Sequence, residues 1–238
     1  MKKVLVLFLL CCSMSSQAFW GDLTAKSWLV SDDTGKILQS ENIHEVRSIA
    51  SISKLMTVMI VLDAKQDLEQ YIKPYTRKEL IQLALIKSDN EAARTLCNNY
   101  PGGRDSCMMA MNNKARELGM PNTRFIEPTG LSVFNVSTAE ELIKLVLTAK
   151  EYPEIVSAAK TSEVKIKMRN KWLFFRNTNP IIGHRHEFIV SKTGYIKASG
   201  GCIAMMLDTE IGRRVVILLG SKDTKTRIPE AEFIATKF

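Results

Sequence analysis

Apolar residues gather in two short segments near the start of the chain. Residues 28–30 (Trp-Leu-Val) and 36–38 (Lys-Ile-Leu) flank Asp32-Asp33-Thr34-Gly35, a run of residues that favour tight turns. Two strand-like segments joined by such a run are typical of a β-hairpin. The pattern therefore predicts a hairpin over residues 26–40.

The middle of the chain has the apolar spacing of helices. Its apolar residues recur three and four positions apart, as on one face of a helix. Thr138 and Glu141 are spaced as a capping box, and Gly119 stands where a helix commonly ends. Residues 55–62 are too few to span a bilayer and are expected to be a buried helix segment. The predicted helices cover residues 51–65, 78–86, 91–96, 106–118 and 138–150.

From residue 163 onward the pattern changes to that of strands, followed by a closing helix over residues 229–236. The predicted strands include residues 164–166, 172–175, 188–190, 203–207 and 215–219. An early hairpin, a helical middle and late strands predict an α/β fold. We expect the hairpin to join the late strands in one antiparallel sheet, with a helical lobe beside it and a cleft at the seam.

The first eighteen residues have the three parts of a secretory signal peptide. Met1-Lys2-Lys3 is basic, residues 4–10 are apolar, and Ser16-Gln17-Ala18 offers small residues for cleavage. A buried N-terminal helix is the alternative. We expect residues 1–18 to be a signal peptide and residues 19–238 to form a single domain.

Charge narrows the range of partners only a little. The whole chain has a formal net charge of +8, and loss of Lys2 and Lys3 with the signal leaves +6. A basic exported protein suits an anionic surface such as a cell wall or lipid head groups. The same charge is equally compatible with a role in solubility alone.

Three cysteines remain after residue 18, namely Cys97, Cys107 and Cys202. A Pro-Gly-Gly sequence between Cys97 and Cys107 indicates a loop. In an oxidising compartment a disulfide across that loop is expected, with Cys202 left as a buried thiol.

The histidines do not indicate a histidine-based mechanism. His184 and His186 lie in a charged Gly-His-Arg-His-Glu segment and are expected to be solvated, and His44 is isolated. A Ser-His-Asp mechanism needs a histidine held by a carboxylate, and a zinc site needs further ligands. No such cluster stands out, so no metal is predicted.

A serine activated by lysine is the alternative chemistry. Ser51 and Lys54 are three positions apart, which places them on one face of a helix. Backbone N–H groups at a helix start can stabilise developing negative charge. Among apolar neighbours such as Leu55 and Met56, a lysine can lose its proton near neutral pH and serve as a base.

The order of motifs distinguishes Ser51 from two serines with the same spacing, Ser157 and Ser162, which precede Lys160 and Lys165. Ser88-Asp89-Asn90 follows Ser51 in the polar break at residues 87–90. Lys192-Thr193-Gly194 follows at the exit of an apolar strand. Neither other serine has a Ser-x-Asn element between it and that tripeptide.

These three motifs, in this order, resemble those of the penicillin-recognising serine enzymes. Residues 47–57, 118–132 and 177–180 resemble the low-molecular-mass penicillin-binding DD-peptidases in particular. The resemblance runs from about residue 24 to about residue 236 and is strongest to the short D-alanyl-D-alanine endopeptidases (penicillin-binding protein 7-like). It implies the β-lactamase/DD-peptidase-like fold, with an antiparallel sheet flanked by helices and a helical lobe, and a catalytic domain over residues 19–238.

The resemblance also implies catalytic roles. Ser51 would be the nucleophile and Lys54 its base, while Ser88 and Asn90 would relay the proton to the leaving amine and orient the peptide. Lys192 would lower the pKa of Lys54 by like-charge proximity.

Substrate contacts are implied on the third motif. Thr193 would hydrogen-bond the substrate, and Gly194 would leave space for it. The backbone N–H groups of Ser51 and Tyr195 would form the oxyanion hole. Many relatives have a threonine where this chain has Ile196, which puts carboxylate recognition in doubt. Arg213 or Arg214 is the alternative source of that charge, but both are expected to be solvated strand-end positions.

The resulting hypothesis is a periplasmic DD-endopeptidase that cleaves peptidoglycan cross-links and is inhibited covalently by β-lactams. A DD-carboxypeptidase is the first alternative. A β-lactamase is disfavoured because Glu127 lies in a peptidase-like Glu-Pro-Thr-Gly-Leu segment, and a silent wall-binding protein because all the motif residues are intact. No cofactor, no nucleic acid and at most peripheral membrane association are expected.

Overall fold

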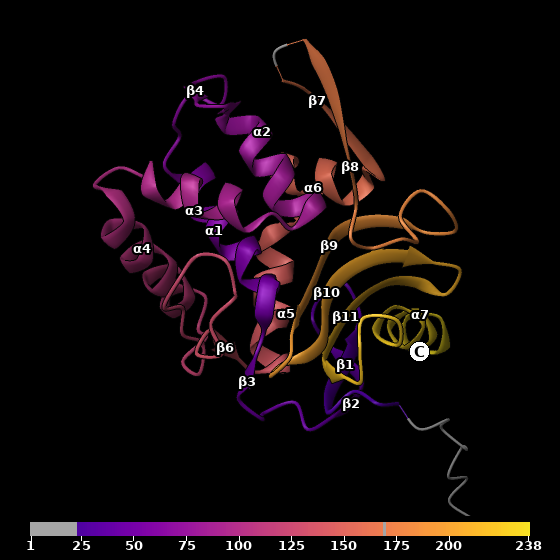
Figure 1. Ribbon diagram of the computed structural model, residues 1–238. Helices are drawn as coiled ribbons and strands as arrows, with labels where there is room; N and C mark the ends of the chain where they lie inside the picture. The colour runs from indigo at the N-terminus through magenta and orange to yellow at the C-terminus, as the bar shows by residue number, and fades with distance from the viewer. Residues whose placement is uncertain (1–22, 169) are drawn as a thin grey trace, which may run out of the picture.

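The computed structural model describes residues 23–168 and 170–238 (Figure 1). The predicted signal peptide lies outside the described residues. The longer strands are β1 (Ser27–Ser31), β2 (Ile37–Glu41), β7 (Glu163–Met168), β8 (Lys171–Arg176), β9 (Glu187–Ile196), β10 (Gly200–Thr209) and β11 (Gly212–Ser221). Two-residue strands are β3 (Arg47–Ser48), β4 (Tyr71–Ile72), β5 (Tyr75–Thr76) and β6 (Val136–Ser137). The α-helices are α1 (Ser53–Asp63), α2 (Arg77–Gln82), α3 (Asn90–Asn98), α4 (Gly103–Glu117), α5 (Ala139–Ala149), α6 (Pro153–Lys160) and α7 (Arg227–Lys237).

The main sheet has five antiparallel strands in the order β2-β1-β11-β10-β9. The N-terminal hairpin therefore joins the late strands, as predicted. Its turn is held by Asp32, whose Oδ1 accepts hydrogen bonds from the backbone N–H groups of Thr34 (2.9 Å) and Lys36 (3.0 Å). Strand β9 carries the third motif and lies at the edge of this sheet.

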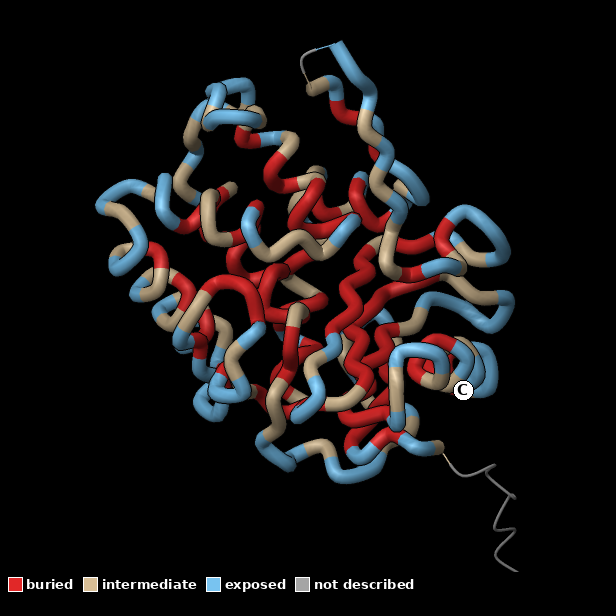
Figure 2. Tube along the Cα trace, in the orientation of Figure 1, coloured by how far each residue is buried: buried red, intermediate tan, exposed pale blue. Residues whose placement is uncertain are grey.

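Both faces of the sheet are covered, which explains the continuous apolar runs in β10 and β11. The side chains of alternate β10 residues pack in two different hydrophobic cores. Ala204 and Met206 face the core shared with α1 and α5, whereas Ile203 and Met205 face the core under α7. Figures 1 and 2 show the helical lobe on one side of the sheet and α7 on the other, with buried chain concentrated in the central strands.

The helical lobe differs from prediction around the polar break. The expected helix over residues 78–86 is α2 followed by a π-helical turn, Leu83–Lys87, and Ser88 then takes a left-handed conformation with φ 59°. A non-glycine residue in that conformation turns the chain sharply. Helix α4 begins three residues earlier than predicted, and α6 was not predicted at all.

The capping box expected at α5 is only half present. Thr138 Oγ1 accepts a hydrogen bond from the Glu141 backbone N–H at 3.1 Å. The Glu141 carboxylate, however, accepts from the Asn122 backbone N–H (2.9 Å) and the Thr123 hydroxyl (2.6 Å). It thereby ties the loop after α4 to α5 instead of closing back on Thr138.

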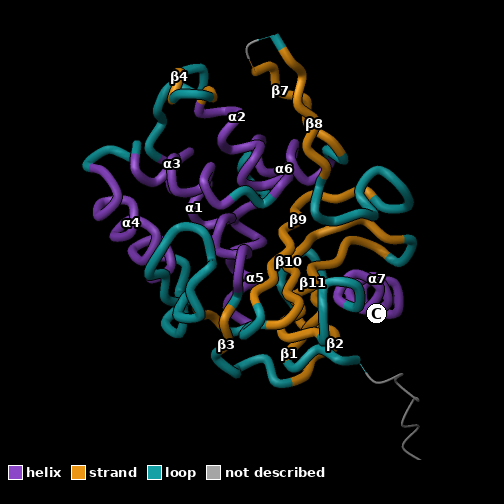
Figure 3. The backbone as a smooth tube through the Cα atoms, in the orientation of Figure 1, coloured by secondary structure: helices purple, strands orange, loops and turns teal. Residues whose placement is uncertain are grey.

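Strands β7 and β8 pair only with each other and form a hairpin that projects from the body of the molecule (Figures 1 and 3).

Cys97 in α3 and Cys107 in α4 form a disulfide, and Cys202 is a buried thiol. Among the described residues, no helix is long and apolar enough to cross a membrane.

Candidate active site

Three separate segments bring the motif residues to one side of the main sheet. Ser51 lies in a 3₁₀ turn, Ala50–Ile52, directly before α1, and Lys54 lies in the first turn of α1. The turn begins at Ala50, which has a positive φ of 45°. This differs slightly from the expected single helix, but Ser51 and Lys54 still share one face.

Lys54 connects the first two motifs. Its Nζ donates to Ser51 Oγ (2.9 Å), Asn90 Oδ1 (2.7 Å) and the Thr129 carbonyl (2.6 Å). A neutral amine keeps two of these N–H donors and gains a lone pair. With its two N–H groups on Asn90 and Thr129, neutral Lys54 would direct that lone pair at the Ser51 hydroxyl proton.

Burial lowers the pKa of Lys54 from 10.5 to about 7, because the charged ammonium loses water on entering the protein. Leu55 and Met56 are fully buried, as the predicted dry setting requires. The carboxylates of Glu127 and Asp89 oppose the shift in part. A large share of Lys54 is therefore neutral at physiological pH.

Of the two predicted causes, the apolar setting is observed, whereas the charge of Lys192 is not among the contributions to this pKa. The electrostatic contributions to the pKa of Lys54 come from Glu127, Asp89 and Arg94, and burial outweighs them. The like-charge effect acts instead on Lys192, whose pKa lies well below 10.5. Burial is again the main cause, followed by Lys54 and Arg227.

Lys192 links the third motif to the second. Its Nζ donates to Ser88 Oγ and to the Thr193 carbonyl, both at 2.8 Å. The left-handed conformation at Ser88 turns the chain just before Asn90 begins α3. Lys192-Thr193-Gly194 lies within β9 and not at its exit, so a rigid edge strand holds the motif.

Two glycines allow close packing around Ser51. A Cβ on Gly194 would lie 3.0 Å from Ala50 Cβ and from the Ser51 backbone nitrogen. A Cβ on Gly130, where φ is +82°, would lie 1.9 Å from the Ala50 carbonyl oxygen. Gly194 therefore lets β9 approach the nucleophile turn, while its predicted role of leaving space for substrate stays a prediction.

Glu127 shapes the loop that supplies the Thr129 carbonyl. Its carboxylate accepts from the backbone N–H groups of Thr129 (2.8 Å) and Gly130 (2.6 Å), and from the Thr129 hydroxyl (2.6 Å). Several hydrogen bonds to one carboxylate fix a loop more firmly than any single one. The Glu127 carboxylate thus holds the loop in the conformation in which the Thr129 carbonyl accepts from Lys54 Nζ.

Arg227 is a site residue that the sequence did not indicate. It lies at the start of α7, is buried, and donates from Nη1 to the Gly194 carbonyl at 2.7 Å. Its Nε has no hydrogen-bond partner among the described residues. Arg213 and Arg214 lie at the opposite end of the sheet, where Arg213 pairs with Asp208 at 2.7 Å.

The remaining candidates lie elsewhere or face solvent. Ser157 and Ser162, with Lys160 and Lys165, are exposed, and Lys160 pairs with Glu187. The Tyr195 side chain is 47% exposed beside the motif. The predicted oxyanion hole uses the backbone N–H of Tyr195 and not its side chain.

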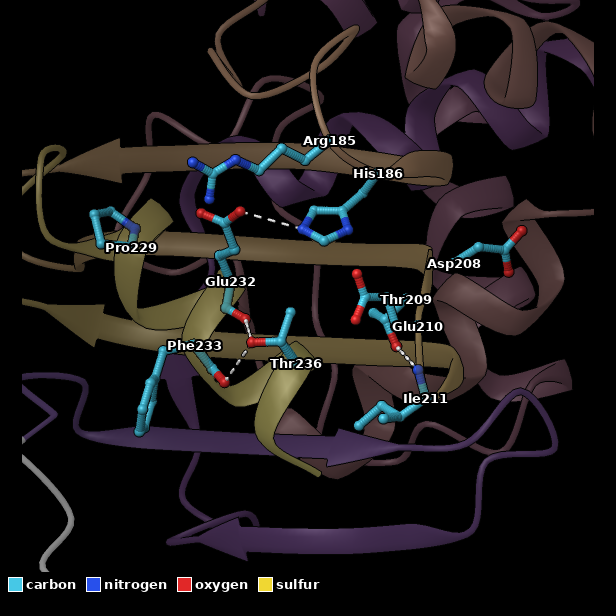
Figure 4. Close-up of a pocket in the computed structure, with 10 residues that line it drawn as sticks. All are labelled: Arg185, His186, Asp208, Thr209, Glu210, Ile211, Pro229, Glu232, Phe233 and Thr236. Carbon is cyan, nitrogen blue, oxygen red and sulfur yellow. Dashed lines mark hydrogen bonds and ion pairs between the residues drawn. The ribbon is translucent and has the colours of Figure 1, made fainter.

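A groove of about 850 Å³ lies between α7 and the β10–β11 turn (Figure 4). His186 Nε2 lies 3.2 Å from the Glu232 carboxylate on its wall, and the His186 side chain is only 12% exposed. The prediction that this histidine is solvated was therefore wrong, because Glu232 on α7 holds it. None of the motif residues lines the groove. Within residues 23–168 and 170–238, no cluster of histidine, cysteine or acidic side chains could hold a metal ion.

Comparisons with known proteins agree with this geometry. A family model described as D-alanyl-D-alanine carboxypeptidase (peptidase S11) matches residues 13–74 and 69–222. The D-alanyl-D-alanine endopeptidase of Pseudomonas aeruginosa is 40% identical over 222 residues, which cover 83% of this chain and 71% of the relative. That of Escherichia coli is 40% identical over 219 residues, covering 82% and 70% respectively.

Solved structures show the same fold. Penicillin-binding protein D2 of Listeria monocytogenes, crystallised with bound cefotaxime, is similar with a TM-score of 0.78 and 26% identity. The match covers 90% of this chain and 96% of that one. The DD-transpeptidase of Streptomyces K15 has a TM-score of 0.82 at 20% identity, with the same coverage of both chains.

Proposed function

This chain belongs to the D-alanyl-D-alanine carboxypeptidase family of serine peptidases, and we propose that it is an endopeptidase that hydrolyses D-alanyl cross-links in peptidoglycan. The observation that carries the proposal is the Lys54 amine, within hydrogen-bond distance of both Ser51 Oγ and Asn90 Oδ1. The two relatives at 40% identity are named endopeptidases, which favours cross-link cleavage. Release of terminal D-alanine is the second candidate, favoured by the family description.

In the proposed mechanism, neutral Lys54 takes the Ser51 proton as Oγ attacks the carbonyl carbon of the D-alanyl bond. The developing oxyanion accepts hydrogen bonds from the backbone N–H groups of Ser51 and Tyr195. Collapse of the tetrahedral intermediate breaks the C–N bond, and the amine leaves with the proton that Lys54 had taken, relayed through Ser88, so that Lys54 is neutral again. Water then hydrolyses the resulting ester on Ser51, with Lys54 again as base.

The third motif is proposed to hold the substrate along the edge of β9. The Thr193 hydroxyl donates to Thr178 Oγ1 at 2.6 Å. This hydrogen bond fixes the Thr193 rotamer, and the Thr193 oxygen can then accept a hydrogen bond from the substrate. Arg227 adds a buried positive charge behind Gly194, whereas Arg213 and Arg214 lie too far along the sheet for that role. A β-lactam would enter the same site and leave a stable ester on Ser51, and the likeness to a cefotaxime-bound structure supports this.

The proposed place of action is the periplasm, after removal of residues 1–18, with residues 19–238 as the catalytic domain. The basic n-region and apolar run of the N-terminus support export.

Digestion of defined wall fragments tests the proposed function. We expect purified protein to convert cross-linked dimeric muropeptides into monomers, and to release less free D-alanine from uncross-linked pentapeptides. Chromatography with mass spectrometry measures both products. If D-alanine is the sole product, the second candidate replaces the first; if neither substrate changes, the peptidase proposal is wrong.

Acylation by penicillin is expected to depend on pH through Lys54. Because the neutral amine is the proposed base, the second-order acylation rate should fall about tenfold per pH unit below about 7 and level off above it. Stopped-flow measurement with a fluorescent penicillin between pH 5 and 9 gives the profile. A flat profile would contradict the assigned base.

Histidine needs a separate control because its usual pKa, about 6.5, lies close to that of Lys54. The triple variant H44Q/H184Q/H186Q removes every histidine in the chain. We expect its inflection to stay at the same pH. Loss of the inflection would assign it to a histidine.

A further inference from the structure

The β7–β8 hairpin exposes a face of aromatic and basic side chains. Trp172 and Phe174 on β8 are 58% and 55% exposed. On β7 their cross-strand partners are Lys167 and Lys165. The Lys167 ammonium lies 5.9 Å from the Trp172 ring centroid, and the Lys165 ammonium 5.3 Å from that of Phe174. We call these four residues the aromatic–lysine face.

This face contributes nothing to the core. The opposite side of the hairpin is the buried one, where Val164 and Ile166 join the main core and Phe175 packs against it. Lys87, from the π-helical turn, lies 4.8 Å from the Phe175 ring centroid. Two large exposed rings side by side on one strand form an exposed apolar patch, and such patches commonly mark binding surfaces.

The root of the hairpin is fastened to the candidate active site. The Thr178 backbone N–H, two residues after β8, donates to the Ile86 carbonyl at 3.0 Å. The Thr178 hydroxyl accepts from Thr193 in the third motif at 2.6 Å. Six residues per strand give the hairpin a length of about 20 Å. Its exposed face is thus held at a fixed distance from the site.

The charge of the hairpin is one-sided. Its described residues include Lys165, Lys167, Lys171 and Arg176 against a single acid, Glu163. Such a segment attracts an anionic polymer, and the attraction is screened by salt.

We propose that the aromatic–lysine face binds a peptidoglycan strand at a distance from the bond being cut. The apolar faces of amino-sugar rings fit the rings of Trp172 and Phe174, which lie about 7 Å apart as alternate residues of one strand. Carboxylates of the peptide stems fit Lys165 and Lys167. The inference rests on the proposed function, because the ligand it assigns to this face is the polymer whose cross-links the enzyme is proposed to cut.

A wall polymer fits this face better than a lipid bilayer does. Two rings, each beside an ammonium group, offer little apolar area for insertion, and stable membrane binding grows with the buried apolar area. The fixed link from Thr178 to the third motif favours a ligand that reaches the site as well.

The test compares polymeric and small substrates with the variants W172A/F174A and K165Q/K167Q. We expect W172A/F174A to bind purified sacculi about tenfold more weakly and to release soluble fragments from them correspondingly more slowly. Cleavage of a soluble dimeric muropeptide and acylation by fluorescent penicillin should stay at wild-type rates. K165Q/K167Q should weaken sacculus binding mainly at low salt.

The variant F233A is the matched control. Phe233 on α7 is also exposed, at 41%, and lies beneath a lysine, with the Lys237 ammonium 6.0 Å from its ring centroid. It belongs to the groove of Figure 4 and not to the hairpin. We expect F233A to bind and digest sacculi like the wild type.

Three outcomes would overturn the inference. The first is W172A/F174A binding and digesting sacculi at wild-type levels. The second is equal loss in F233A. The third is that W172A/F174A no longer binds vesicles of anionic phospholipid while it still binds sacculi, which would assign the face to a membrane. Failure of the wild type to cleave the soluble dimer would instead contradict the proposed function, while its sacculus binding still reports on the hairpin.

Discussion

Ser51→Ala is expected to eliminate the covalent penicillin adduct and to slow cleavage of cross-linked muropeptides by at least about 10⁴-fold. Ser51 Oγ is the hydroxyl that Lys54 Nζ contacts, at 2.9 Å, and alanine offers no oxygen for an ester. Intact-protein mass spectrometry after penicillin treatment measures the adduct. The digestion assay measures cleavage. The fold should survive, because the change removes one oxygen from a partly exposed side chain.

The chain provides its own controls for this substitution. Ser157 and Ser162 have the same three-residue spacing to a lysine, yet both are exposed. Ser157→Ala and Ser162→Ala should acylate like the wild type. An adduct on the Ser51→Ala protein, or its loss in either control, would remove Ser51 as the nucleophile.

Much of the fold could be predicted because its signals are local. The turn chemistry of Asp32-Asp33-Thr34-Gly35 specifies the first hairpin, and the apolar runs of β10 and β11 require cover on both faces. The α/β fold and the family are confirmed by the comparisons. The boundaries in the helical lobe were less predictable, since the π-helical turn before Ser88 has no local sequence signal.

The candidate site was predictable through motif order and not through spacing. Three serines share the Ser-x-x-Lys pattern, and only Ser51 is followed by the other two motifs in order. The roles assigned to its residues remain predictions. What the structure adds is proximity, since Lys54 contacts Asn90 at 2.7 Å and Lys192 contacts Ser88 at 2.8 Å.

Two features could not be predicted because they depend on tertiary contacts. Arg227 reaches Gly194 from a helix 33 positions later, and nothing in its neighbourhood marks it as a site residue. The pKa of Lys54 depends on how completely residues from several segments bury it, so the sequence predicted the direction of the shift and an apolar setting, but also gave part of the effect to Lys192. Apolar neighbours can be inferred from the sequence, whereas the extent of desolvation has to be seen in the packed protein.

Replacing Lys54 should separate its action as a base from its charge. We expect Lys54→Arg and Lys54→Met each to lower the acylation rate about 10³-fold. Arginine keeps a cation that can still donate to Asn90 and Thr129, but it cannot be deprotonated in this pH range. Methionine removes both the charge and the base. If the lysine acted only as a charge, Lys54→Arg would retain most of the activity.

The residual acylation rates of the Lys54 variants provide a second test. If a variant were slow only because neighbouring side chains had moved, its rate would still depend on pH as in the wild type. In Lys54→Met the inflection near pH 7 should be absent, since the group with the pKa of about 7 is gone. Lys87→Met is the control, because Lys87 lies near the site as a half-exposed partner of Asp89 at 3.0 Å. Such a surface pair contributes little, so this variant should stay within about twofold of the wild type and keep the inflection. An inflection that persists in Lys54→Met would show that another group supplies the base, and the short contact between Lys54 and Ser51 would then serve only to position the nucleophile.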